Sequence, residues 1–256
     1  MRAFEFPGQY YEVIRGTLRD VHAETAYLAD WLAKSGKTTG GRVLDLGCGT
    51  GTTLRALAAR GHGGVGVDAS ATFIAWAAEA GGDGLEYVRA DLTDLDVAEF
   101  ATEEPFDLVV CLFATLNMVP PEALVPLLRQ VRGRLAPGGH LVLDAAHLLG
   151  FVDTYQPSMI AHHQRDGVLL TRMVHTSVNG HTACWRNEET ILARDPDGAV
   201  SMHENGFDQW VLTAPQIRGA LAAAGFRVVA EHGGFRDAPP PPFGKGPLVQ
   251  VAALDG

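Results

Sequence analysis

The sequence predicts an α/β fold in which a doubly wound, mostly parallel sheet of seven strands carries a helical cap before it and a small antiparallel insertion after the fifth strand. Short apolar strands alternate with helical segments from residue 42 to residue 144. Such continuous apolar strands indicate a parallel sheet covered by helices on both faces. Helical periodicity precedes the first strand, and strand alternation replaces it between about residues 167 and 211.

The cap comprises residues 1–40. Its main helix is expected from Asp20 to Lys34, because apolar side chains recur there at helical spacing until Gly36 and Gly40 stop the pattern. The core then follows as strand 42–46, helix 52–60, strand 64–67, helix 71–80, strand 85–89, a short helix near Val97, strand 106–112, helix 121–135 and strand 140–144.

The insertion comprises residues 151–211. Apolar residues alternate from Val168 onward, and Asn179-Gly180 and Asp197-Gly198 are typical turn dipeptides that flank a short strand expected from Thr190 to Ala193. A helix over 214–224 and strands over 226–230 and 248–252 then return to the core, which consists of residues 41–150 and 212–256.

Composition limits the class of partner. The chain has 256 residues, 46% of them hydrophobic, which is enough to bury a full core, and a net charge of −10 that gives no general attraction to nucleic acid or anionic lipid. It contains neither a secretory signal pattern nor an apolar run near the ~20 residues that cross a bilayer. We therefore expect a cytoplasmic protein with a small-molecule substrate, no nucleic-acid partner and no membrane; homo-oligomer formation is left open.

Cysteine and histidine usage predicts no metal site. The three cysteines form no CxxC pair, and Cys111 is expected to be buried within a strand. His162 and His163 lack a third ligand at a recognisable spacing, so we expect them at the surface.

The most specific segment is VLDLGCGTG, residues 43–51, which runs from the first strand through a glycine-rich turn into a helix. Gly47, Gly49 and Gly51 let the backbone approach a ligand where a Cβ would collide. Asp45, at the strand end, offers an acceptor for an amino group.

Two further acids follow strand ends. Asp68 ends the second strand, where an α/β sheet places a carboxylate on ribose hydroxyls. Asp91 follows the third strand and is suited to accept a hydrogen bond from an adenine amine.

VLDLGCGTG, GVGVDAS, VRADL, FDLVVCLF and LAPGG occur in the order and spacing of class I S-adenosylmethionine-dependent methyltransferases, which the chain resembles from about Arg42 to Ala145. The resemblance implies a Rossmann-like fold with S-adenosyl-L-methionine as cofactor and S-adenosyl-L-homocysteine as product. It implies that the glycines line the methionine end, that Asp68 holds the ribose and that Asp91 and Leu92 face the adenine. The expected cofactor residues are Tyr11, Asp45, Gly47, Gly49, Gly51, Asp68, Ala69, Asp91, Leu92 and Leu112.

A dinucleotide site is the alternative for a glycine-rich turn after a first strand. Its GxGxxG spacing is absent, because position 52 is Thr and the third glycine is Gly51. The carboxylate of Asp45 would also repel a pyrophosphate, whereas it suits a zwitterionic methionine or its sulfonium.

A narrower resemblance rests on the segment Tyr10–Gly16, the strand-rich insertion and the ending Ala224–Val228. These are similar to the glycine-type N-methyltransferases and the methyltransferases of antibiotic and amino-sugar biosynthesis. The resemblance implies that the N-terminal segment folds over the cofactor and that the insertion roofs the substrate site. One departure is Met118, where some amino-sugar enzymes place a histidine.

Methyl transfer is an in-line displacement, so positioning and water exclusion supply much of the catalysis, and a base is needed only for a protonated nucleophile. His147, just past the fifth strand, is the candidate base, with an ordinary loop histidine as the alternative, and Tyr11 is a candidate catalytic residue that closes the pocket. The candidate substrate residues are Tyr10, Phe113, Asn117, Trp185, Arg186 and Trp210.

The predicted function is methyl transfer to an amine of a small polar metabolite in antibiotic or amino-sugar biosynthesis. A small-molecule O-methyltransferase and a noncatalytic cofactor-binding homologue remain as alternatives. An RNA methyltransferase is disfavoured by the acidic balance and by the lack of a recognisable added RNA-binding domain.

Overall fold

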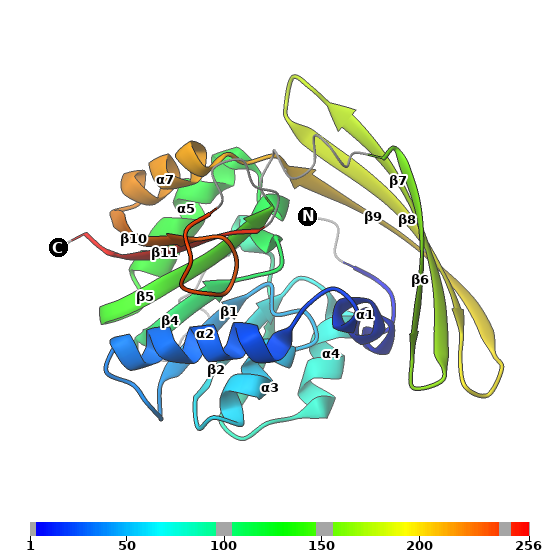
Figure 1. Ribbon diagram of the computed structural model, residues 1–256, viewed down its shortest axis with the longest axis horizontal. Coiled ribbons are helices and arrows are strands. Elements are labelled where there is room, and N and C mark those ends of the chain that lie inside the picture. Colours follow the sequence, from blue (N-terminus) through cyan, green and yellow to red (C-terminus); the bar gives the residue numbers. More distant parts are fainter. Residues whose placement is uncertain (1–3, 96–103, 147–155, 241–246, 256) are drawn as a thin grey trace.

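The chain forms two sheets that stand side by side (Figure 1). The computed structural model describes residues 4–95, 104–146, 156–240 and 247–255. The core sheet has seven strands in the order β10-β11-β5-β4-β1-β2-β3, with β11 antiparallel to both of its neighbours and the remaining pairs parallel. Its strands are β1 (Arg42–Leu46), β2 (Gly63–Asp68), β3 (Leu85–Arg89), β4 (Phe106–Cys111), β5 (Leu135–Ala146), β10 (Phe226–His232) and β11 (Pro247–Leu254). The predicted fold class is confirmed.

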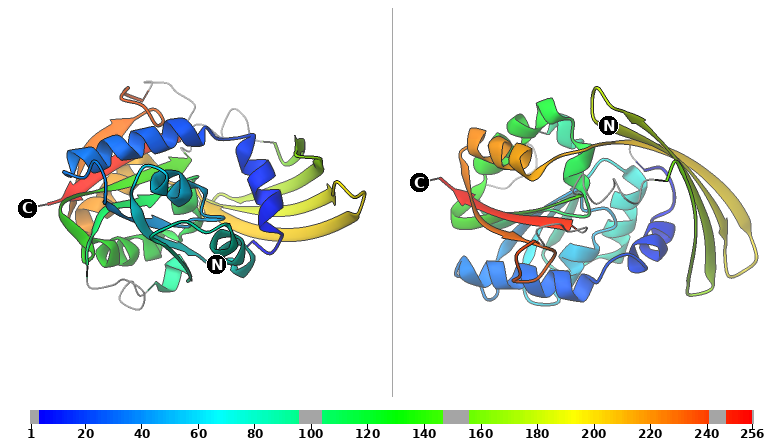
Figure 2. Two further views of the ribbon diagram at one scale, coloured as in Figure 1. Left: turned by 90° about the horizontal axis from the view of Figure 1, so that it is seen from below. Right: turned by 45° about the horizontal axis from the view of Figure 1, so that its top comes forward.

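Helices cover both faces of the core sheet, as Figures 1 and 2 show. One face carries α2 (Val21–Lys34), α3 (Thr52–Ala58) and α4 (Ala71–Ala80), and the other carries α5 (Pro121–Arg132) and α7 (Ala214–Ala223). Two separate clusters of buried apolar side chains fill the spaces between the sheet and these helices. Both faces of the central strands are therefore dry, which explains their uninterrupted apolar sequence.

Capping side chains stabilise the N-termini of two of these helices at the positions predicted from the sequence. Asp20 accepts a hydrogen bond from the backbone N–H of Ala23 at 3.0 Å, and Ser70 accepts one from Phe73 at 3.2 Å. Cys111 is fully buried in β4, as predicted. The helix predicted to end at residue 135 stops at Arg132, because the LAPGG segment already pairs with β4 as the start of β5. The short helix predicted near Val97 lies outside the described residues.

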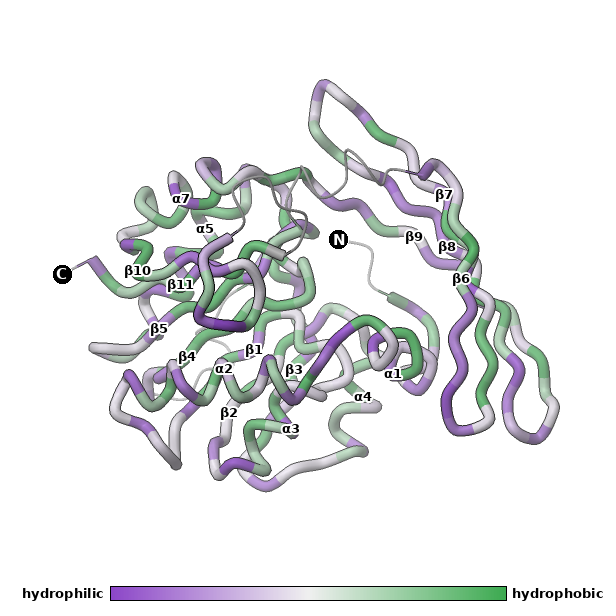
Figure 3. The backbone as a smooth tube through the Cα atoms, viewed as in Figure 1, coloured by the Kyte–Doolittle hydropathy of each residue, from purple (hydrophilic) through white to green (hydrophobic). Residues whose placement is uncertain are grey.

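The insertion forms a four-stranded antiparallel sheet, here called the roof sheet, in the order β6-β7-β8-β9. Its strands are β6 (Ser158–Arg165), β7 (Val168–Asn179), β8 (Cys184–Arg194) and β9 (Val200–Trp210). The predicted length of the strand over 190–193 was wrong. Strand β8 is longer, because it pairs along its whole length with a neighbour on each side. Figure 3 shows the contrast in hydropathy: the central core strands are largely apolar, whereas polar and apolar residues mix along the roof strands.

Helix α1 (Gly8–Gly16) fixes the roof sheet to the core. Its buried Val13 and Ile14 share an apolar cluster with Leu170 and Ile191 of the roof and with Phe73 of α4. His163, predicted at the surface, is instead buried on β6, where its Nδ1 lies 2.8 Å from the hydroxyl of Thr17 just beyond α1. In the described parts of the chain, no helix is both long and apolar enough to cross a membrane.

Candidate cofactor and acceptor site

A cavity of about 270 Å³ lies between the core and the roof sheet, at the carboxyl ends of the parallel strands. Residues of the core form its floor, including Gly47, Gly49, Asp68 and Ala146. Residues of the roof sheet form its ceiling, namely Arg172, Glu189, Phe207 and Gln209. The carboxyl edge of a doubly wound sheet is where such folds bind ligands.

The glycine turn after β1 follows a backbone path that needs glycine. Gly47, Gly49 and Gly51 have φ of 73°, 56° and 78°. A Cβ on Gly47 would lie 2.3 Å from Cγ2 of Thr115, and one on Gly51 would lie 2.5 Å from the hydroxyl of Tyr87. Gly47 and Gly49 line the cavity, whereas Gly51 packs beneath the turn at the start of α3, so its role is to support the turn.

Asp68 lies at the end of β2 and faces the cavity together with Ala69. Its two carboxylate oxygens accept hydrogen bonds from the backbone N–H groups of Gly49 and Ser70, each at 2.9 Å. Burial raises the pKa of Asp68, and these backbone donors oppose the rise. The carboxylate is thus held in one orientation, with its remaining acceptor capacity available for the hydroxyls that the family resemblance assigns to it.

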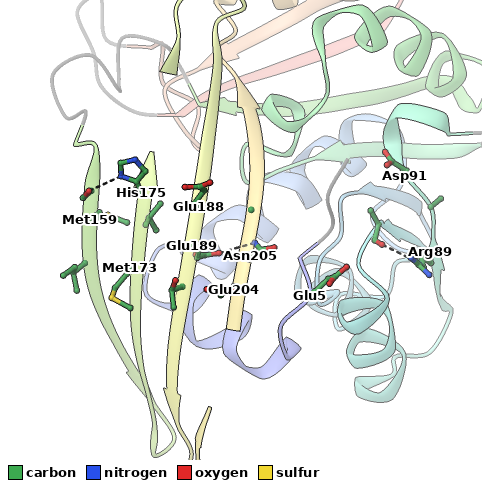
Figure 4. A pocket seen from close by; sticks show the side chains of 17 residues that line it. Glu5, Arg89, Asp91, Met159, Met173, His175, Glu188, Glu189, Glu204 and Asn205 are labelled. Carbon is green, nitrogen blue, oxygen red and sulfur yellow. Dashed lines mark hydrogen bonds between the residues drawn. The ribbon is translucent and has the colours of Figure 1, made fainter. Parts of the chain in front are cut away.

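Asp91 and Leu92 mark the junction between the cavity and a much larger open cleft of about 1360 Å³. Leu92 is buried and lines the cavity, whereas Asp91 lines the cleft and accepts hydrogen bonds from the N–H and hydroxyl of Thr93. Figure 4 looks into this cleft, with Asp91 and Arg89 on the core side and His175 and Glu188 on the roof strands.

Asp45 does not border the cavity. It is 2% exposed beneath the floor, and burial raises its pKa to about 7, a rise that the nearby Arg15 opposes. Leu112 likewise packs in the apolar cluster on the α2 side of the sheet. Direct cofactor contact by either residue stays a prediction.

A buried charge network, which the sequence analysis did not single out, joins the N-terminal segment to the floor. Arg19 forms ion pairs with Glu24 and with Asp144 at the end of β5, the latter at 3.0 Å. Arg15 donates to the hydroxyl of Thr53 at 3.0 Å, yet its Nη1 is buried without a partner, as is Nη2 of Arg19. The signal in the sequence is a charged residue that interrupts apolar neighbours, as in Val13-Ile14-Arg15.

Aromatic residues of the N-terminal segment close one side of the cavity. The ring of Tyr11 lies 4.7 Å from that of Phe73, and its Cε1 is the atom nearest to a Cβ built on Gly49. Burial raises the pKa of Tyr11, so its phenol keeps its proton at neutral pH. As a catalytic candidate, Tyr11 is therefore suited to donate a hydrogen bond and to exclude water, and unsuited to act as a base.

The turn after β4 adds a strained wall to the cavity. Phe113 and Ala114 both have positive φ, 59° and 56°, which is uncommon for residues other than glycine. The N–H of Ala114 donates to Asp144 at 2.6 Å, and the guanidinium of Arg19 lies 4.9 Å from the ring centre of Phe113. The buried network therefore holds this turn, and Phe113 borders the cavity as a substrate-binding candidate should.

The remaining predicted substrate residues are scattered. Asn117 is buried and joins Ala146 to the carbonyl of Trp210, which makes it a structural link between the core and β9. Tyr10 is not among the residues that line the cavity: its buried ring packs on His203 and its hydroxyl donates to Asp195 at 2.9 Å, on the α1 side of the roof sheet. Direct substrate contact by Tyr10 stays a prediction.

Arg186 and Trp210 line a separate cavity of about 310 Å³ that shares Phe207 and Met118 with the main cavity. Trp185 lies at a much smaller recess beside Trp210. These positions leave both tryptophans and Arg186 as candidates for more distant parts of an acceptor. His147 lies outside the described residues.

Comparison with known proteins agrees with this geometry. Residues 43–139 match the family model described as a methyltransferase domain. The chain is 27% identical over 252 residues to a dTDP-3-amino-3,6-dideoxy-α-D-glucopyranose N,N-dimethyltransferase from Streptomyces fradiae, covering 97% of this chain and 91% of that protein.

Solved structures show the same fold. A sugar N-methyltransferase from Streptoalloteichus is 25% identical with a TM-score of 0.74, covering 98% of this chain and 94% of the other. An S-adenosylmethionine-dependent methyltransferase from Clostridium acetobutylicum has a TM-score of 0.80 at 15% identity, covering 97% of each chain.

The protein is an S-adenosylmethionine-dependent methyltransferase, and its fold is that of the solved methyltransferase structures. Within this class it resembles the N-methyltransferases of amino sugars.

The residues present fit the cofactor. Gly47 and Gly49 present backbone to the cavity, and the buried Nη1 of Arg15, which has no hydrogen-bond partner, would suit the carboxylate of a methionine moiety. When bound, S-adenosylmethionine supplies an activated methyl group on a sulfonium. The floor residues would bind and orient it, and Tyr11 and Phe113, which also line the cavity, would keep water away.

Proposed function

We propose that this enzyme methylates an amine nitrogen of a small polar metabolite, an amino sugar or a related antibiotic precursor. The observation that carries the proposal is the ceiling of the cavity, where the charged Arg172 and Glu189 and the amide of Gln209 face the cofactor floor. An acceptor has to lie between floor and ceiling, so polar ceiling groups favour an acceptor that offers hydrogen bonds and charge.

The relatives support the same class of acceptor. The Streptomyces fradiae protein is named for an amino-sugar substrate, and the Streptoalloteichus protein is named as a sugar N-methyltransferase. Both are similar to this chain over nearly its whole length, so the likeness includes the roof sheet as well as the cofactor motifs.

The chain's own residues supply positioning. Aromatic side chains of Phe4, Tyr11 and Phe207 surround the cavity, and the rings of Phe4 and Phe207 lie 5.1 Å apart where the N-terminal segment meets β9. An acceptor enclosed by these rings loses bulk water and is held for in-line attack, which supplies much of the rate of a displacement on an activated methyl group.

The test is a methyl-transfer assay with radiolabelled S-adenosylmethionine and a panel of acceptors. Amino sugars should be labelled, while their hydroxyl counterparts, total tRNA, rRNA and genomic DNA should stay at background. Faster labelling of hydroxylated compounds would make the enzyme an O-methyltransferase. Strong labelling of a nucleic acid would overturn the small-molecule assignment, and cofactor binding without labelling of any acceptor would favour a noncatalytic homologue.

A further inference from the structure

The inner face of the roof sheet changes character along its length. Where it packs on α1 it is apolar, with Leu170, Ile191 and Ala193 nearly fully buried. Where it overlies the cavity, the same face carries Arg172 and Glu189. Strand alternation places these five side chains on one face. This face therefore changes from apolar to charged residues at the edge of the cavity.

Glu189 is the most enclosed charged group of the ceiling. Its side chain is 2% exposed, and it lines both the cavity and the open cleft. One carboxylate oxygen is paired with Nε of Arg172 on β7, and the other accepts from the amide of Asn205 on β9 at 3.3 Å. Figure 4 shows Glu189 between the two neighbouring strands, joined to Asn205.

An ion pair at this depth is not needed for stability. Desolvation of a buried pair offsets much of its Coulomb attraction, and apolar replacements of similar volume are often neutral or stabilising. The adjacent apolar end of the same face packs well without charges. The pair joins the buried Glu189 to the partly exposed Arg172, and its position above the cofactor floor supplies a functional reason for it.

We infer that Glu189 receives the acceptor amine and orients it for methyl transfer, an inference that rests on the proposed function. A carboxylate with a charge-assisted bond to Arg172 on one side keeps acceptor capacity on its other lone pairs. An amine whose N–H donates to that carboxylate directs its lone pair away from the ceiling and towards the floor, where the methyl donor binds. A basic amine arrives mainly as its ammonium form, whose charge Glu189 recognises over a neutral hydroxyl. The ammonium gives up one proton through the carboxylate to the open cleft, which frees the lone pair for attack.

The step balances without a further reactant. The nitrogen lone pair forms the new N–C bond as the S–C bond breaks, and the bonding electrons leave with sulfur as the thioether of S-adenosylhomocysteine. The methylated nitrogen then carries one surplus proton. Because Glu189 also borders the open cleft, its carboxylate offers that proton a path to solvent.

The variant Glu189→Gln tests the inference, since it removes the negative charge while keeping the size of the side chain. We measure kcat and KM for the best amino-sugar acceptor of the panel, inhibition by the matched hydroxyl sugar, and S-adenosylhomocysteine affinity by calorimetry. KM for the amine should rise about 10- to 100-fold, the range expected for loss of a charge-assisted hydrogen bond. Inhibition by the hydroxyl sugar and cofactor affinity should stay within about threefold of wild type.

The matched control is Glu231→Gln on β10, which breaks an arginine–glutamate pair with Arg218 on α7, away from the cavity, and should leave KM unchanged. Glu189→Asp keeps the charge but withdraws it by one methylene, so it should raise KM less than Glu189→Gln and covers the case in which the glutamine variant does not fold. If the wild type methylates amines and neither Glu189 variant changes KM, the inference is wrong while the proposed function stands. If the wild type methylates no amine, the proposed function itself fails.

Discussion

The floor and the roof of the cavity hold their carboxylates in different ways. On the floor, Asp68 is fixed by backbone N–H groups of Gly49 and Ser70, which belong to the turns that follow β1 and β2. On the roof, Glu189 is fixed by side chains of Arg172 and Asn205 from two neighbouring strands. The backbone conformation of the floor turns is compatible with few residue types, so the floor suits a cofactor that does not vary. The side chains that hold Glu189 can be replaced by other residues without changing the sheet, so the roof suits an acceptor that varies.

Loss of the floor carboxylate should have the largest effect. Asp68→Ala removes the acceptor of two backbone hydrogen bonds and of the expected ribose bonds, and bonds to charged groups are each worth roughly 1.5–3 kcal/mol. The dissociation constant for S-adenosylhomocysteine, measured by calorimetry, should rise at least about 100-fold. Asp83→Ala, at an exposed turn, is the control. An Asp68 variant that binds within threefold of wild type would remove Asp68 from the cofactor site.

The glycine turn offers a matched pair of substitutions. Gly47 and Gly138 have similar left-handed φ values of 73° and 79°, but a Cβ on Gly47 would lie 2.3 Å from Thr115, whereas a Cβ on Gly138 would meet nothing within 4 Å. Both alanine variants carry backbone strain of about 1–2 kcal/mol, and only Gly47→Ala should also weaken cofactor binding, by about tenfold or more. Equal cofactor affinities in the two variants would mean that the turn does not approach the ligand.

On the roof, Arg186→Ala should have a smaller and more selective effect. Arg186 makes two hydrogen bonds to Asp208, at 2.9 and 2.8 Å, and is largely exposed. Because exposed pairs contribute about 0–1 kcal/mol, KM for the acceptor should rise about two- to fivefold, with cofactor affinity unchanged. Arg194→Ala, on the same face of β8 at its far end, should change neither quantity. A collapse of cofactor affinity in Arg186→Ala would contradict the division between floor and roof.

A pH dependence of stability, with no direct effect on the acceptor, is expected beneath the floor. Burial raises the pKa of Asp45 to about 7, so the folded protein keeps this proton in a range where the unfolded chain, with its pKa near about 4, has lost it. The folded state binds more protons there, and stability falls as pH rises from about 4 to about 7.

Asp45→Asn removes that titration. Relative to wild type without cofactor, its free energy of unfolding should rise by on the order of 1–2 kcal/mol between about pH 4 and pH 7, which corresponds to a few degrees in Tm. Thermal unfolding at a series of pH values measures the difference. Parallel Tm curves for the two proteins would show that Asp45 is ionised throughout.

Sequence motifs at strand ends indicated several cavity-lining residues because these signals are local. Gly47, Gly49, Asp68, Ala69 and Leu92 lie in short motifs at strand ends, and the structure brings all five to one cavity. The strand and helix order followed from apolar periodicity for the same reason.

The roof was less predictable, since alternation tells which side chains share a face but not which end of that face covers the cavity. Arg172 and Glu189 were not distinguished from their neighbours for this reason, and Tyr10 was assigned to the acceptor although it packs on the roof near Asp195. Arg15 and Asp144 were missed because their partners lie far along the chain.

A crystal structure with S-adenosylhomocysteine bound would test the division between cofactor floor and acceptor roof directly. We expect the ribose hydroxyls to contact Asp68, the methionine carboxylate to meet Arg15, and the sulfur to face Glu189 across the space left for an acceptor. A ligand whose sulfur points away from the roof sheet, with Glu189 in contact with neither the ligand nor the space beside its sulfur, would contradict this division.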